Sequence, residues 1–276
     1  MNGATKTAST IKESNPLKTA QRALLCLFLI AIAFSIVQIF AGKRLPFTPG
    51  SLDSFALLLA FASTLVSLTG QLPAQNVLLA AVIIGLMGGA VHTLETLTGL
   101  PFGPVTYTQS SGPLLFQALP WFMPFLWVIV VLNARGVARL ILRPWRKLRA
   151  YGYWLIGLTA SLVLVFVLGL EPMATRVRHD WLWSPTKFPV DWFGAPITDF
   201  LGWVVATLLI LGFSTPALMK KRPTKSYPEY HPLIVWGAIQ LFFISGLVSQ
   251  NLTLAALFVV IGCLAIIPLA IRGARW

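Results

Sequence analysis

The stretch from Asn76 to Thr98 reads NVLLAAVIIGLMGGAVHTLETLT, and it decides the fold of the chain. A helix rises about 1.5 Å per residue and needs about 20 apolar residues to cross the hydrocarbon core of a bilayer. The stretch therefore predicts a transmembrane helix. Two ionisable residues, His92 and Glu95, interrupt it near one end, one helical turn apart.

The whole chain has the composition of a membrane protein. Of its 276 residues, 57% are hydrophobic and 11% are charged, whereas about a quarter of the residues of a soluble domain are charged. Long apolar runs lie near residues 23–42, 54–70, 76–98, 113–134, 151–170, 198–216, 232–249 and 252–271. We therefore expect an all-α, polytopic transmembrane bundle of about eight helices, with a single domain over residues 23–271.

The basic residues predict how the bundle is oriented. Segments 1–22, 135–150, 217–231 and 272–276 hold sixteen Lys and Arg, and the alternate segments hold five, namely Lys43, Arg44, Arg176, Arg178 and Lys187. By the positive-inside rule, we expect cytoplasmic tails at 1–22 and 272–276 and a non-cytoplasmic loop at 171–198. The net charge of +13 then reflects a multi-pass protein of the cell membrane, with lipid and not nucleic acid as its partner.

Most acidic residues gather at the opposite ends of the predicted helices. Glu95 is the most informative, because Gly85, Gly88 and Gly89 share its helix face with His92. Small residues let a neighbouring helix approach closely, so this face should point into the bundle. An ionisable pair there is a functional candidate, and the alternative is a structural hydrogen bond between helices.

A second group of acids is interleaved with aromatic residues after residue 170. Glu171, Asp180 and Asp199 alternate with Trp181, Trp183 and Trp203, and Phe102 and Tyr107 lie in the loop after Glu95. The tryptophans could instead form an ordinary interfacial belt, and Asp199 could simply cap a helix.

No cofactor or metal is predicted. The chain lacks a Gly-rich nucleotide loop, a haem attachment motif and an HExxH zinc motif. His179 and His231 fall on opposite sides of the predicted membrane, and Cys26 and Cys263 each lie inside an apolar run. Carboxylic acids beside aromatic rings suit acid chemistry on an apolar alkene, because a buried carboxyl keeps its proton and a ring face stabilises a cation.

These segments resemble the membrane carotenoid biosynthesis protein family, which includes gamma-carotene 1',2'-hydratases and bisanhydrobacterioruberin hydratases. The resemblance spans roughly residues 85 to 203. It rests on Glu95 with Thr98 to Gly103, Tyr107 and Thr108; on Gly112-Pro113 with Pro120, Pro124 and Trp127; and on Glu171 to Ala174, Trp181 to Trp183, Gly194 to Pro196 and Asp199 to Trp203. The chain departs from the family pattern at Glu171 and Asp199, where Asp and Asn are usual, and at Val105, where Tyr is common.

The resemblance implies that water is added to the terminal 1,2 (1',2') double bond of an acyclic carotenoid end group. On this hypothesis Glu95 is the general acid or the partner of the cation, and His92 orients it. Glu171 and Asp199 are candidates for activating water, with Asp180 as a further candidate. The apolar site would be walled by Phe102, Tyr107, Trp181, Trp183 and Trp203.

Two other interpretations remain open. A transporter or binding protein for an isoprenoid or lipid would place its acids along a water-accessible path, often near the membrane midplane. A structural partner of other carotenoid-pathway enzymes would tolerate replacement of the acids.

Overall fold

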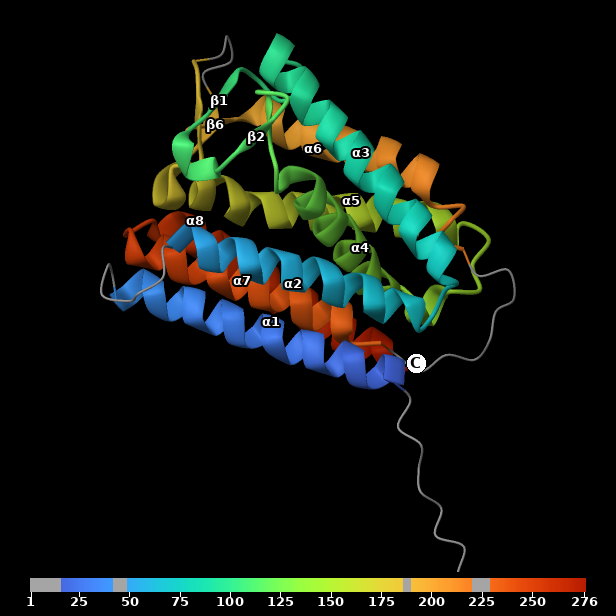
Figure 1. Cartoon of the computed structure of the whole chain (residues 1–276). Helices are drawn as coiled ribbons and strands as arrows, with labels where there is room; N and C mark the ends of the chain where they lie inside the picture. The colour runs from blue at the N-terminus through green and yellow to red at the C-terminus, as the bar shows by residue number, and fades with distance from the viewer. Residues whose placement is uncertain (1–15, 42–48, 186–189, 220–228) are drawn as a thin grey trace, which may run out of the picture.

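The computed structural model describes residues 16–41, 49–185, 190–219 and 229–276, and within them it contains eight long helices (Figure 1). The helices are α1 Pro16–Ala41, α2 Pro49–Thr69, α3 Ala74–Thr98, α4 Met123–Ile141, α5 Tyr151–Pro172, α6 Ile197–Ser214, α7 His231–Ser249 and α8 Thr253–Ala274. Each is long and apolar enough to cross a membrane. The predicted all-α, multi-pass bundle is confirmed.

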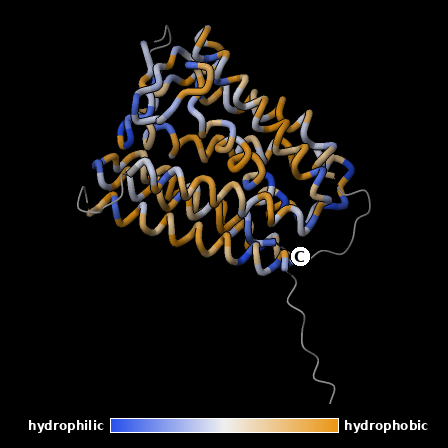
Figure 2. Tube along the Cα trace, in the orientation of Figure 1, coloured by the Kyte–Doolittle hydropathy of each residue, from blue (hydrophilic) through white to orange (hydrophobic). Residues whose placement is uncertain are grey.

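The helices pack as two groups around α4. Helices α1, α2 and α7 contact one another on one side, and α3 contacts α6 on the other, as Figure 1 shows. Helix α4 contacts α2, α3, α5, α7 and α8, and most of its side chains are buried. Hydrophobic residues follow the helices along their whole length in Figure 2. Outward-facing residues such as Leu86 and Leu264 are 69% exposed, as expected of surfaces that meet lipid.

Short strands cap one end of the bundle. Strand β1 Val105–Tyr107 pairs antiparallel with β4 Trp181–Trp183, so that Tyr107 lies opposite Trp181. Two smaller pairs join β2 Leu114–Leu115 with β3 Leu119–Pro120, and β5 Asp191–Trp192 with β6 Ala195–Pro196. The β1–β4 pair brings together the two segments that the sequence marked as unusual.

The fourth helix differs from its prediction. It was expected over 113–134, but α4 begins at Met123 and continues to Ile141. Pro120 belongs to β3, and Pro124 lies in the first turn of α4, where a missing N–H costs no hydrogen bond. Pro120 therefore lies before this helix and Pro124 lies in its first turn, so neither bends it. Arg135, predicted to begin a cytoplasmic loop, is buried within α4 and donates a hydrogen bond to the Leu218 carbonyl oxygen.

The predicted orientation stays a prediction. Helix α1 already begins at Pro16, and Arg272 lies in the last turn of α8, so parts of both predicted tails are helical. Residues 1–15, together with Lys43, Arg44 and Lys187, lie outside the described residues.

Candidate active site

His92 and Glu95 form a close pair at the capped end of α3. The His92 Nδ1 atom lies 2.5 Å from the Glu95 Oε2 atom, and both side chains are buried. The glycine stripe on this face packs on α4, as predicted. A side chain at Gly88 would collide with the ring of Trp127, and one at Gly85 would touch the backbone of Pro124. The pair therefore points into the protein and away from lipid.

Aromatic rings enclose the His92 imidazole. Phe102 stacks on it with ring centroids 4.7 Å apart, and Trp203 approaches it edge-on at 5.4 Å. Trp203 in turn stacks on Trp127 of α4 at 4.1 Å. Of these rings, Trp127 was not among the predicted site residues, although it belongs to the stretches that carry the family resemblance.

Tyr107 brings the carboxyl groups into one cluster. Its hydroxyl oxygen lies 3.5 Å from His92 Nδ1. Burial raises the pKa of Tyr107 above its ordinary value, and the negative charges of Glu95, Glu171 and Asp199 raise it further. Three carboxyl groups, from α3, α5 and α6, are therefore near enough to Tyr107 for their charges to act on its phenol.

Two indole N–H groups hold Glu171. Trp183 Nε1 donates to Glu171 Oε2 at 2.9 Å, and Trp181 Nε1 donates to the same oxygen at 3.2 Å. Alternate residues of a strand point to the same face, so β4 presents both indoles to Glu171. The carboxyl group is 1% exposed and sits where α5 gives way to the irregular turn η4 Met173–Arg178.

Asp199 is buried more completely than any other acid of the site. It is 0% exposed, and neither carboxyl oxygen has a hydrogen-bond partner within the part of the chain that the structure describes. It does not cap α6, because the N-cap residue is Pro196 and the neighbouring Thr198 hydroxyl donates to the Phe102 carbonyl oxygen at 2.6 Å. The capping alternative for Asp199 is therefore excluded.

The structure brings nine of the ten predicted site residues into this acid–aromatic cluster. They are His92, Glu95, Phe102, Tyr107, Glu171, Trp181, Trp183, Asp199 and Trp203. The tenth, Asp180, lies apart from them, beside a pocket that the sequence analysis did not predict.

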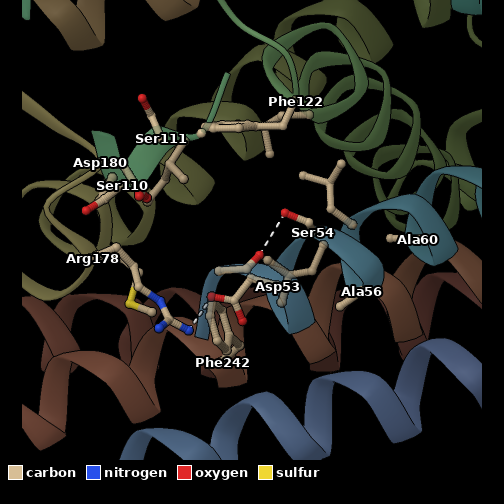
Figure 3. A pocket seen from close by; sticks show the side chains of 18 of the residues that line it. Asp53, Ser54, Ala56, Ala60, Ser110, Ser111, Phe122, Arg178, Asp180 and Phe242 are labelled. Atoms are coloured by element: carbon tan, nitrogen blue, oxygen red, sulfur yellow. Dashed lines mark hydrogen bonds and ion pairs between the residues drawn. The ribbon is translucent and has the colours of Figure 1, made fainter. Parts of the chain in front are cut away.

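That pocket has a volume of about 740 Å³ and lies among α1, α2, α4, α5 and α7 (Figure 3). Its inner part is apolar and includes Phe28, Ala60 and Ile129. Its polar end, at the capped end of the bundle, includes Asp53, Ser110, Ser111, Arg178 and Asp180. The size and lining are those of a site for a hydrophobic small molecule.

An ion pair marks the polar end. Arg178 pairs with Asp53 of α2, and its guanidinium carbon lies 5.6 Å from the centre of the Phe242 ring. Burial raises the pKa of Asp180 to about 7, an effect that Arg178 opposes and Asp53 reinforces. The Asp53–Arg178 pair is not predicted from the sequence, because residues so far apart in the chain meet only after folding.

Trp181 is common to the pocket and the acid–aromatic cluster. It lines the pocket, and its indole N–H donates a hydrogen bond to Glu171. The other eight members of the cluster do not line the pocket. Among the described residues, no group of three or more His, Cys, Asp or Glu is placed to hold a metal ion.

Comparison with known proteins points to one family. The family model described as carotenoid biosynthesis protein matches residues 53–268. The bisanhydrobacterioruberin hydratase of Haloarcula japonica is 27% identical over 173 residues, which is 60% of this chain and 56% of the relative. The chain thus spans just over half the length of that relative. No solved structure matches the chain.

Proposed function

Because the chain belongs to the carotenoid biosynthesis protein family, we propose that it hydrates the terminal 1,2 (1',2') double bond of an acyclic carotenoid end group. One observation carries the proposal: a cluster of three buried carboxyl groups and aromatic rings shares Trp181 with the lining of an apolar pocket. Hydration needs a proton donor, a surface that tolerates a cation and a base for water. The cluster offers all three.

The first step is proton transfer to the alkene. Glu95 is the donor in this proposal, and the 2.5 Å contact with His92 fixes its orientation. The proton adds to the carbon of the double bond that bears hydrogen, and the electron pair of the double bond forms the new C–H bond. The positive charge is left on the carbon that bears two methyl groups, where it is most stable. A positioned general acid typically contributes about 100- to 10,000-fold to a rate.

The second step is attack by water on the tertiary cation. An aromatic face stabilises a nearby cation by roughly 0.5 to 2 kcal/mol, and Trp181, which lines the pocket, provides such a face. As the C–O bond forms, an O–H bond of water breaks and Glu171 or Asp199 accepts the proton. The proton gained there balances the proton lost by Glu95, so the net reaction is the addition of one water molecule.

Asp180 is the alternative proton donor, because it is the one predicted acid that lines the pocket. With a pKa of about 7, a substantial fraction of its carboxyl groups carries a proton at neutral pH. Replacing each acid by its amide separates the two assignments. If Glu95 is the donor, E95Q loses most of the activity and D180N keeps it; the reverse pattern assigns the role to Asp180.

The test is expression in a bacterium that accumulates lycopene or gamma-carotene, followed by mass spectrometry of the pigments. We expect a product heavier by one water with unchanged visible absorption, because the added water lies outside the conjugated chain. E95Q should lower its yield about 100-fold or more. E229Q is the matched control, since Glu229 bonds Gln21 far from the cluster. No hydrated product from inserted wild-type protein would refute the proposal.

The second candidate is an isoprenoid or lipid carrier without catalysis. The observation that favours it is the pocket itself, which extends from a charged end into the apolar interior. A carrier would bind pigment equally well as wild type and E95Q and would leave the mass of the pigment unchanged.

A further inference from the structure

Trp181 and Trp183 differ in one respect that the structure makes explicit. Both are residues of β4, both point to the same face of the strand, and both donate their indole N–H to Glu171 Oε2. Only Trp181 also lines the pocket. Both tryptophans therefore hold Glu171, but only Trp181 is also placed to contact a ligand in the pocket.

The two indole N–H groups determine which oxygen of Glu171 can accept a proton. A carboxylate oxygen has two lone pairs in the plane of the group, and two N–H donors occupy both of those on Oε2. A proton taken up by Glu171 must therefore reside on Oε1. The two indoles also fix the plane of the carboxyl group, so the direction in which Oε1 points is set by β4.

Trp181 also connects Glu171 with the pocket. Leu170, Met173 and Ala174 of the same helical segment line the pocket, whereas Glu171 itself does not. Trp181 lines the pocket, donates its indole N–H to Glu171 and is 3% exposed. Tyr107, its partner across β1 and β4, holds it edge-on with ring centroids 6.2 Å apart. Trp181 is therefore in contact with both Glu171 and the pocket.

We propose that Trp181 is the positioning residue that couples pocket to cluster: its ring supports the end group of an acyclic isoprenoid, and its N–H holds Glu171 so that Oε1 accepts the proton of the attacking water. This inference rests on the proposed hydration and assigns the water-activating role to Glu171. Trp183 positions the same carboxyl group but makes no contact with the ligand. The apolar chain of the substrate then extends toward Phe28 and Ile129 in the inner part of the pocket.

The orientation of the substrate follows from the same arrangement. Glu171 lies at the capped end of the bundle, and so do Asp53, Arg178 and Asp180. An end group held against Trp181 therefore lies at the polar end of the pocket, where a newly formed hydroxyl group finds hydrogen-bond partners. The hydrocarbon chain occupies the part of the pocket that has no polar lining.

The experiment compares two matched pairs of variants by steady-state kinetics in detergent or vesicles. W181F and W183F each remove one N–H from Glu171 Oε2 and keep a ring, so both should lower kcat, by about tenfold, with little change in KM. W181A and W183A remove the ring as well. W181A should also raise KM about tenfold, whereas W183A should leave KM unchanged.

Equal KM values for W181A and W183A would overturn the role of Trp181 at the pocket, and an unchanged kcat in both Phe variants would overturn the role of the N–H groups. Pigment retained by the purified protein provides a readout that does not need turnover. W181A should retain less lycopene than wild type, and W183A the same amount. If wild type binds lycopene in this pattern but hydrates no carotenoid, the proposed function and the assignment of Glu171 fail while the contact between ring and ligand stands.

Discussion

At the scale of single residues, the acids of this protein fall into two environments. Glu95, Glu171 and Asp199 are enclosed by aromatic rings, and each is at most 1% exposed. Asp180 lies outside the helices, at the polar end of the pocket, where its backbone is held by Thr108 and Ala174. Burial acts on all of these carboxyl groups, but only Asp180 faces a space that a ligand can occupy.

Asp180 should make stability depend on pH. Its pKa is raised to about 7 by burial, whereas the unfolded chain has the ordinary value of 3.8. Between these values the folded state of this group binds more protons than the unfolded state, so the contribution of Asp180 to stability is largest below about pH 4, falls as pH rises and levels off above about pH 7. D180N should flatten this dependence. Thermal unfolding at pH 5 and pH 8 checks this prediction. Between these two pH values, the Tm of wild type should fall by about a few degrees more than the Tm of D180N.

An equal loss of Tm in wild type and D180N would show that the carboxyl group is not buried in the folded protein. D191N is the control, because Asp191 is exposed and its carboxyl group accepts a hydrogen bond from the Gly194 N–H. A change in Tm that D191N shares with D180N would reflect the loss of one carboxyl charge and not the burial of Asp180.

At the scale of elements, close helix contacts position the site. Helix α3 meets α4 through Gly88, which leaves room for the Trp127 ring, and α6 meets the loop after α3 through Gly202, which leaves room for Phe102. These two glycines allow the aromatic rings to reach His92. The pairing of β1 with β4 supplies Tyr107, Trp181 and Trp183 from the other side.

Gly202 provides a test of this packing. A methyl group there would collide with the Phe102 ring, so we expect G202A to destabilise the protein by about 1 to 3 kcal/mol, as overpacking of a core does. G212A on the same helix is the matched control, because a methyl group at Gly212 meets no neighbouring atom within 4 Å. It should be neutral or stabilising, since alanine favours a helix by up to about 1 kcal/mol over glycine. Thermal unfolding in detergent measures both.

Equal Tm values for the two variants would mean that Phe102 does not pack against α6. Activity adds a second readout. G202A should lose hydration activity to a greater extent than its loss of folded protein explains, because Phe102 stacks on His92.

At the scale of the whole molecule, the pocket is formed by five helices, α1, α2, α4, α5 and α7, together with segments at the capped end of the bundle. About 10 Å of helix rise separates Asp53 from Ala60 on α2, and the pocket extends over this length from its charged end to its apolar interior. Ala56 and Ala60 are small and buried, and they leave the interior open. The volume of the pocket therefore depends on Ala56 and Ala60, whose side chains have no reactive group.

Filling the inner part should select against long substrates. A60L would place a larger side chain in the pocket, and we expect KM for lycopene to rise about tenfold, with a smaller rise for a shorter acyclic isoprenoid. A62L is the matched control, because Ala62 is on the same helix but does not line the pocket. Kinetics with two chain lengths check the prediction. A proportional loss on both substrates would show that the chain does not extend to Ala60.

The sequence by itself determined the eight helices, because a bilayer requires long apolar runs and such runs can be read residue by residue. It also marked nine residues that meet in one cluster, because an ionisable residue inside an apolar run is costly unless it serves a purpose. It misplaced the start of α4, since Pro120 and Pro124 bend or begin a helix depending on what packs around them.

Only the tertiary structure decided that Asp180 lies with Asp53 and Arg178 at a pocket, and that Trp181 lies between this pocket and Glu171. The physical reason is that a pocket is the space left among five helices. The lengths and patterns of those helices are local properties, but the space between them depends on how all of them pack.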